Sequence, residues 1–244
     1  MFDLRGTRVL IAGGSSGVGL ATAKLLIEYG AEVVINGRDR TKLDSVKKEL
    51  GAQASISAFD AANPEDRTRA LAEVGKFDHL VVSLSGGKGA GPFTRIEQAD
   101  LRSGFEGKFW INFCLAQEAL RYLSDCGSIT FVSAISARAA NPGTAGLAAI
   151  NSAIEGLVKP LAVELRPRRV NAVSPGVSAM PVWDWMQEEQ KQSVFAKFAA
   201  TTPAGRVGKP GDVAQSSVFL IGNSFMTGCV LECCGGLRLV GQSL

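Results

Sequence analysis

The chain has 244 residues, a hydrophobic content of 46% and a formal net charge of +3. This length and composition allow one large core, and the mixed charges exclude the basic stripe of a nucleic-acid-binding protein. We expect no membrane-spanning run, and the first residues resemble a strand rather than a signal peptide. The five cysteines, an odd number without metal-ligand spacing, predict no metal site and favour a reducing cytoplasm.

The most informative stretch is RVLIAGGSSGVG at residues 8–19. Its apolar run at 9–12 predicts a buried parallel strand, and the apolar spacing at 20–30 predicts a helix that ends at a glycine. Glycines between a strand and a helix allow a tight turn, and the N–H groups that open the helix attract an anion. An ordinary glycine-rich turn is the alternative. The residues expected to bind phosphate are Gly13, Ser15, Ser16, Gly17, Val18 and Gly19.

The next strand, expected at 32–36, is followed by Gly37 and Arg38. In dinucleotide-binding folds an acidic residue at this place usually holds the ribose hydroxyl of NAD. A guanidinium in its stead favours the additional phosphate of NADP(H) over NAD(H), although Arg38 facing only solvent is the alternative. Asp60, after a third strand at 54–59, is placed to accept a hydrogen bond from the adenine amino group.

Strand and helix patterns alternate to the end of the chain and predict one α/β domain over residues 1–244. His79 opens its strand, far from the ligand edge, so we interpret it as structural. A long excursion at about 177–205 contains Trp183, Trp185 and Phe195, which fit either an apolar ligand or simple packing. Further helices are expected at 41–50, 64–74, 100–123, 146–165 and 211–220, strands at 79–83, 128–133, 169–173 and 230–234, and a turn at 174–176.

Several separated motifs resemble the short-chain dehydrogenase/reductase family along the whole chain. They are the glycine turn, Asp60, LAVEL at 161–165, RVNAVSPG at 169–176, GRVG at 205–208, DVA at 212–214, TG at 227–228 and GG at 235–236. The resemblance implies a doubly wound, Rossmann-type α/β fold with a seven-stranded parallel sheet, helices on both faces and a nicotinamide cofactor. It also implies a homodimer or homotetramer joined through the helices at 100–123 and 146–165. Further cofactor contacts are implied at Ala61, Ser83, Pro175, Gly176 and Val177.

The chain departs from the family at the residues that perform its chemistry. The family uses a Ser, a Tyr and a Lys, and the matching places hold Ala134, Leu147 and Asn151. The family's Asn-Asn-Ala-Gly segment after the fourth strand is replaced by VSLS at 82–85. The family's Thr that touches the carboxamide is replaced by Met180. The resemblance therefore implies an intact pyrophosphate half and a rebuilt nicotinamide half of the cofactor site.

Lys108 occupies a place where the resemblance implies an Asn, and Asn151 occupies the place of the family's Lys. The two residue types have therefore exchanged helices. One hypothesis is that Lys108 supplies the positive charge and the proton that the Tyr–Lys pair would supply. The alternative is that Lys108 pairs with Glu106 or a backbone carbonyl. Ser133 and Arg138 are further catalytic candidates, Arg138 as a cation that polarises a carbonyl or as an exposed loop residue.

Three functions remain compatible with these residues. The first is an NADP(H)-dependent oxidoreductase that moves hydride to or from a small apolar carbonyl or alcohol by an atypical mechanism. The second is a non-redox enzyme of the same fold, such as a cyclase or isomerase, and the third is a catalytically silent NADP(H)-binding protein. We expect a small apolar substrate, a cytoplasmic location, and neither nucleic acid nor membrane as partner.

Overall fold

The computed structural model describes residues 2–240, whose seven strands form one parallel sheet in the order β3-β2-β1-β4-β5-β6-β7. The strands are β1 Arg8–Ala12, β2 Glu32–Gly37, β3 Ala54–Ala58, β4 Phe77–Val82, β5 Leu123–Val132, β6 Arg169–Pro175 and β7 Val230–Cys233. The chain winds outward from β1 in one direction and from β4 in the other. Ligands of such sheets bind where that direction reverses, at the carboxyl ends of the strands.

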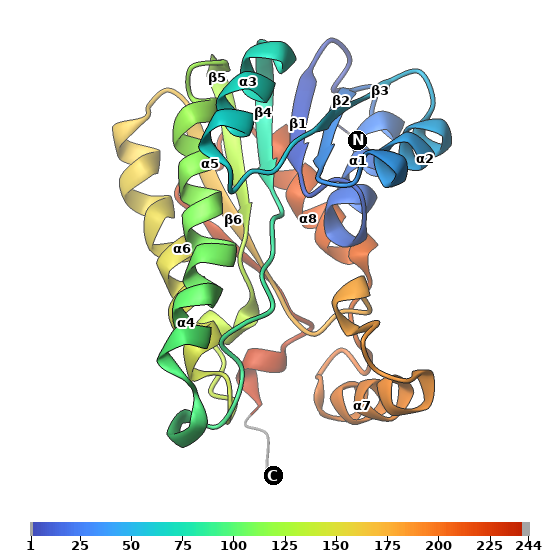
Figure 1. The fold of residues 1–244 in the computed structure, drawn as a ribbon. Helices are drawn as coiled ribbons and strands as arrows, with labels where there is room; N and C mark the ends of the chain where they lie inside the picture. The colour runs from blue at the N-terminus through green and yellow to red at the C-terminus, as the bar shows by residue number, and fades with distance from the viewer. Residues whose placement is uncertain (1, 241–244) are drawn as a thin grey trace.

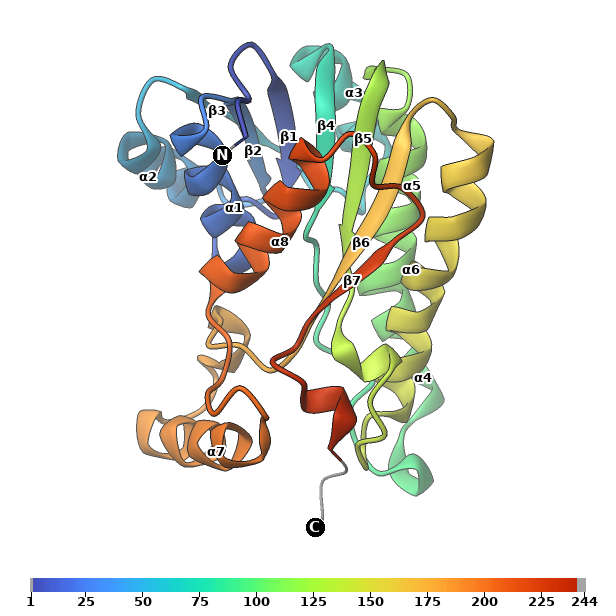
Figure 2. The same ribbon diagram turned by 180° about the vertical axis from the view of Figure 1, so that it is seen from behind.

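Helices cover both faces of the sheet, as expected (Figures 1 and 2). One face carries α3, α5 and α6, and the other carries α1, α2 and α8. The helices are α1 Gly17–Glu28, α2 Arg40–Leu50, α3 Pro64–Val74, α4 Gln98–Gly104, α5 Ile111–Ala119, α6 Ala145–Glu164, α7 Glu188–Thr201 and α8 Pro210–Gly222. The doubly wound architecture predicted from the sequence is confirmed.

The alternation of side chains along β1 explains why both faces are apolar. Leu10 and Ala12 pack into the core under α3, α5 and α6, whereas Val9 and Ile11 pack into the core under α1, α2 and α8. A central parallel strand is buried on both sides, so its sequence is a continuous apolar run.

The single helix expected at 100–123 was wrong. The structure divides it into α4, a π-helical segment at Phe105–Trp110 and α5, and Leu123 already begins β5. The backbone is closely packed where α4 meets the π-helical segment. A Cβ on Gly104 would lie 2.7 Å from both the Ile150 side chain and the Lys88 carbonyl. Buried Leu123 continues the apolar spacing of the helix, and it therefore misled the sequence-based prediction.

The turn expected at 174–176 was also wrong at its start, because β6 continues to Pro175, which pairs with Cys233 of β7. A proline is tolerated there since it is the last residue of its strand. The excursion that follows contains α7, which projects from the body of the molecule (Figure 1). All residues of α7 belong to the described part of the chain, and none of them is buried.

Helix α6 is apolar and long enough to cross a membrane by length and composition, with a mean hydropathy of 1.2 over eighteen residues. The sequence analysis expected no such run. In the structure, Ile154 and Val158 of this helix pack against the sheet, and the same buried face carries Asn151. These contacts make α6 a wall of the protein core.

Buried His79 links folding stability to pH. Its Nδ1 lies 2.9 Å from Ser128 Oγ, and burial, with the nearby Arg169 charge, lowers its pKa from 6.5 to about 4. The unfolded chain therefore binds a proton at a higher pH than the native protein does, and stability falls as the pH drops from 6.5 toward 4. We expect this residue to reduce the free energy of unfolding by about 2 kcal/mol between roughly pH 7 and pH 5.

Urea denaturation of wild type and His79→Gln at both pH values measures this contribution, because glutamine keeps a hydrogen-bonding side chain but does not titrate. His79 is the only histidine of the chain, so other imidazoles do not interfere. An equal loss of stability in both proteins would show that His79 is not the cause.

Candidate functional site

The glycine turn lies where the sheet order reverses, against the end of β4. A Cβ on Gly13 would lie 2.7 Å from the Ser83 carbonyl oxygen, and a Cβ on Gly19 would collide with the Gly13 carbonyl. Ser83 N–H in turn donates to the Ala12 carbonyl at 2.9 Å. The glycines are therefore required for the chain to turn back on itself between β1 and α1.

The first turn of α1 is shaped to receive an anion. Its N-cap residue Ser16 is extended, and no described side chain caps the helix or places an acid in the first turn. Gly17 has a φ of +54°, and a Cβ there would meet only Pro181 Cδ, at 3.5 Å. Uncapped N–H groups beside an open backbone fit the pyrophosphate of a dinucleotide.

The ends of β2 and β3 lie beside this turn. A Cβ on Gly37 would lie 3.1 Å from Ser15 Oγ, so Ser15 touches the end of β2, and exposed Arg38 comes next. Asn36, buried in β2, donates its side-chain amide to the Ser57 and Phe59 carbonyls at 3.1 Å each. These bonds join β2 to the end of β3 and so position the segment at Asp60.

The adenine-side candidates are held by local hydrogen bonds. One carboxylate oxygen of Asp60 accepts from Ala62 N–H at 3.0 Å, and buried Ala61 receives Arg67 Nη1 on its carbonyl at 2.8 Å. The structure therefore brings Ser15, Arg38 and the Asp60 segment to one end of the carboxyl edge, next to the glycine turn.

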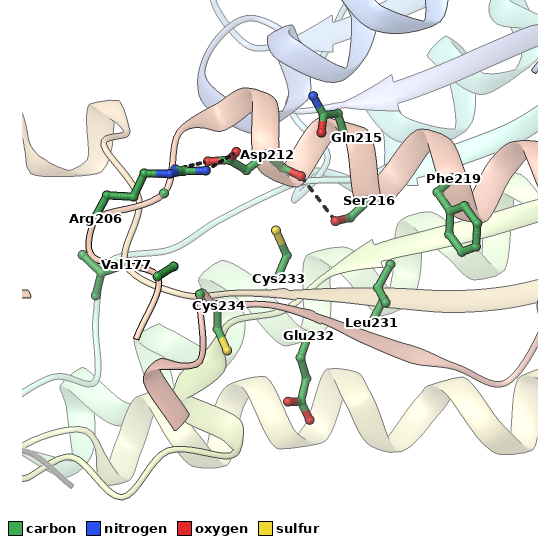
Figure 3. Close-up of a pocket in the computed structure, with 13 residues that line it drawn as sticks. Val177, Arg206, Asp212, Gln215, Ser216, Phe219, Leu231, Glu232, Cys233 and Cys234 are labelled. Carbon is green, nitrogen blue, oxygen red and sulfur yellow. Dashed lines mark hydrogen bonds and ion pairs between the residues drawn. The ribbon is translucent and has the colours of Figure 1, made fainter. Parts of the chain in front are cut away.

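The candidates after β6 lie further along the edge. Gly176 N–H donates to the Cys233 carbonyl at 2.9 Å, and the Val177 carbonyl accepts from Gly208 N–H at 2.9 Å. Val177 also lines a cavity of about 550 Å³ between α8 and β7, in which Cys233 points toward α8 (Figure 3). No other predicted cofactor residue lines this cavity, so it is distinct from the glycine turn. Within residues 2–240, no three His, Cys, Asp or Glu side chains gather to hold a metal ion.

The three places that the sequence analysis matched to the family's catalytic residues lie in one short turn and the start of α6 that packs on it. Ala134 follows β5 and precedes the short 3₁₀ turn at Ile135–Ala137. The Asn151 amide nitrogen donates to the Leu147 carbonyl at 2.8 Å and to Ser136 Oγ at 3.1 Å, which joins this turn to the start of α6. The Asn151 carbonyl oxygen is buried and has no hydrogen-bond partner among the described residues.

Lys108 lies within the π-helical segment and is only 8% exposed. Its Nζ donates to the Ser133 carbonyl at 3.4 Å, so the backbone carbonyl, and not exposed Glu106, is its partner in the structure. Burial lowers the pKa of Lys108 from 10.5 to about 8. An ammonium with this pKa can release a proton close to neutral pH, which is what a general acid requires.

The sequence analysis missed Glu155, which connects the remaining candidates. The two carboxylate oxygens of Glu155 accept from Ser133 Oγ and from Arg138 Nε, both at 2.8 Å. Arg138 also donates to Glu232 at 3.1 Å, and Glu232 pairs with Arg238. Arg138 is thus held by two carboxylates, and its role in polarising a carbonyl stays a prediction. The sequence did contain one signal for Glu155, because it is an acidic residue in a largely apolar helix, four positions after Asn151.

Comparison with known proteins fits this arrangement. The family described as enoyl-(acyl carrier protein) reductase matches residues 12–238. The 3-oxoacyl-[acyl-carrier-protein] reductase FabG of Rickettsia prowazekii is 32% identical, over 98% of this chain and 100% of its own length.

Two solved structures extend the comparison. A small-chain dehydrogenase in complex with NADPH is 30% identical with a TM-score of 0.81, covering 96% of this chain and 99% of the other. The MalC reductase/Diels-Alderase of Malbranchea aurantiaca is 27% identical with a TM-score of 0.87, covering 97% of each chain. With the sheet order and the glycine turn, these matches show that the chain belongs to the short-chain dehydrogenase/reductase family.

Proposed function

We propose that the protein is an NADP(H)-dependent oxidoreductase that transfers hydride to or from a small apolar carbonyl or alcohol. The observation that carries this proposal is the uncapped, open start of α1 beside Gly37 and Arg38. The NADPH complex of a solved relative and the reductase names of others support it. When bound, the nicotinamide supplies or accepts the hydride.

The residues of this chain would hold the cofactor in two parts. The first turn of α1 receives the pyrophosphate, and Arg38 gives the 2′-phosphate a charged, bidentate partner. Asp60 keeps one carboxylate oxygen for the adenine amino group, since its other oxygen accepts from Ala62 N–H. Arg38 is the reason for preferring NADP(H) to NAD(H).

The catalytic half works, in this proposal, without the family's Ser, Tyr and Lys. The aliphatic side chains of Ala134 and Leu147 have no acidic proton to donate, and the Asn151 amide does not ionise. Lys108 is the group that supplies positive charge and a proton to the substrate oxygen, because its burial lowers its pKa to about 8. Glu155 fixes Ser133, whose carbonyl holds the ammonium in place.

A second candidate is a non-redox activity such as a cyclisation, in which a shaped apolar pocket does the work. The likeness to a protein named both reductase and Diels-Alderase favours it specifically. Binding of NADPH without turnover of any carbonyl would move the assignment to this candidate or to a catalytically silent binding protein.

A second copy of the chain is the proposed protein partner, and the proposed location is the cytoplasm, without nucleic acid or membrane as partner. Helix α6 is apolar, yet only 28% of its most apolar eighteen residues are buried, and Val163 is 70% exposed. Gly156 has no atom within 4 Å of the place of a Cβ, so this stretch is open. Exposed apolar helices of this kind pair in oligomers.

Replacement of Arg38 by glutamine tests the cofactor assignment. We expect Arg38→Gln to weaken NADPH binding by about 10- to 100-fold, because a charge-assisted contact to phosphate contributes about 1.5–3 kcal/mol. NADH affinity should change little, since NADH lacks that phosphate. Fluorescence titration measures both dissociation constants, with Arg40→Gln as the matched control, and equal weakening of the two cofactors would contradict the assignment.

Replacement of Lys108 tests the proton donor. With a panel of apolar ketones, quinones and enones, we expect Lys108→Met to lower kcat by about 100-fold while NADPH affinity is retained. Because the protonated form acts, kcat of the wild type should fall as the pH rises above about 8. Exposed Lys159→Met is the control. Unchanged turnover in Lys108→Met would exclude Lys108 as the acid.

The partner is tested by Gly156→Arg, which adds charge to the exposed face of α6. Arginine favours helix over glycine by about 1 kcal/mol, so the fold should be retained. We expect sedimentation analysis to show an oligomer for wild type and a monomer for the variant, and a wild type that is monomeric throughout would refute the pairing.

A further inference from the structure

Glu232 joins the edge of the sheet to the candidate site. It is the third residue of β7, whose side chains alternate between the two faces of the sheet. Val230 packs into the core under α6, and Cys233 points toward α8, on the other face. Figure 3 shows the Glu232 side chain pointing away from α8. Its carboxylate therefore lies on the face of the sheet that α6 covers.

Four charged side chains of alternating sign form a chain from α6 to the C-terminal end of the described structure. Arg138 donates from Nε to Glu155 at 2.8 Å and from Nη1 to Glu232 Oε1 at 3.1 Å. The second oxygen of Glu232, Oε2, accepts from Arg238 Nε. Each carboxylate oxygen of Glu232 is thus bound by a different guanidinium, and each charge of the chain contacts one of opposite sign.

This chain of charges is shielded at its inner end and exposed at its outer end. The side chain of Glu155 is 9% exposed, whereas that of Arg238 is 43% exposed. Ion pairs contribute little where water screens them and more where water is excluded. The bond between Glu155 and Arg138 is therefore the strong contact, and Arg238 can be replaced without leaving a fully buried charge unpaired.

Glu155 holds both ends of the turn formed by residues 133–138. One of its oxygens accepts from Ser133 Oγ, and the other accepts from Arg138 Nε, both at 2.8 Å. The carbonyl of Ser133 is the one partner of Lys108 Nζ among the described residues, at 3.4 Å. A movement of the 133–138 turn therefore changes the support of this ammonium.

The GG motif at 235–236 lets the chain return to Glu232. Both glycines have a positive φ, +61° and +85°, and the 3₁₀ turn Leu237–Leu239 follows them. Leu237 is buried and anchors this turn in the protein. Arg238, the next residue, is thus carried by an anchored turn when it meets the carboxylate of Glu232.

We propose that Glu232 and Arg238 are positioning residues, which hold the 133–138 turn where Lys108 requires it and do not touch the substrate. The inference rests on the proposed role of Lys108 as the proton donor. It gives the GG motif and the C-terminal turn a function that the proposed reaction alone does not give them.

The positioning depends on how the two oxygens of Glu232 are shared. With Arg238 in place, Glu232 keeps a single oxygen for Arg138. Without Arg238, both oxygens of Glu232 bind Arg138 side by side, as carboxylates bind guanidinium groups most strongly, and draw it away from Glu155. The 133–138 turn then loses one of its two anchors, and the ammonium loses its carbonyl partner.

Carbon-13 NMR of the full chain, labelled at lysine Cε, tests this without any need for turnover. The signal of Lys108 is identified by its absence in Lys108→Met. We expect Arg238→Gln to shift the titration midpoint of Lys108 by about half a pH unit to lower pH, because the ammonium loses a hydrogen bond. Loss of a positive charge by itself would shift the midpoint to higher pH. Arg238→Lys keeps the charge and should retain the midpoint of the wild type.

Turnover of the carbonyl panel with NADPH gives a second readout. We expect Arg238→Gln to lower kcat by about 10-fold and to change NADPH affinity by less than about 2-fold, because a misplaced acid slows only the chemical step. Since Arg238 acts through Glu232, the double variant Glu232→Gln/Arg238→Gln should lose no more kcat than Glu232→Gln alone. Glu49→Gln is the control, because it removes an exposed ion pair with Lys24 between α1 and α2.

The outcomes separate this inference from the proposed function. A midpoint at lower pH in Arg238→Gln, restored by Arg238→Lys, supports the inference. An unchanged or higher midpoint overturns it, and so do independent losses of kcat in the double variant. A wild type that binds NADPH but reduces no carbonyl overturns the proposed proton donation, while the NMR midpoint still decides the positioning role. Failure to bind NADPH overturns the proposed cofactor site alone.

Discussion

The burial of β1 and β4 on both faces determines where chemistry is possible in this molecule. Their apolar side chains lie in the two cores, where a polar group loses water and needs an internal partner, as His79 has in Ser128. The carboxyl edge is different, because strands end there and their backbone turns. Gly13, Ser83, Ser133 and Gly176 each come directly after the end of a strand, so the candidate residues lie along this edge.

The fold could be predicted because its signals are local and redundant. The apolar run at Val9, the helix after Gly19 and the proline that opens α3 each specify an element through short-range physics. The boundary errors have a common cause. Leu123 is apolar in the register of the preceding helix, and hydrophobic periodicity does not distinguish a buried helix end from a strand start. The π-helical segment left no separate signal in the sequence.

The site was predictable only in part, because its contacts join distant residues. The glycine turn and Arg38 were identified from one continuous stretch. The contacts of Glu155 with Ser133 and Arg138 connect three segments, and nothing local in the sequence pairs them. Lys108 was singled out by its position, whereas its burial and its bond to the Ser133 carbonyl required the fold. The cofactor-side residues can thus be recognised from local sequence, whereas the contacts of the catalytic-side residues become visible only in the fold.

The burial of Lys108 limits which substitutions this protein can accept. Helix α6 packs against the π-helical segment that carries Lys108, and Asn151 is on the buried face of α6. A lysine at position 151 would add a second buried ammonium to this region, where like charges repel. Lysines at 108 and 151 are therefore disfavoured together, so a change at one position depends on the residue at the other.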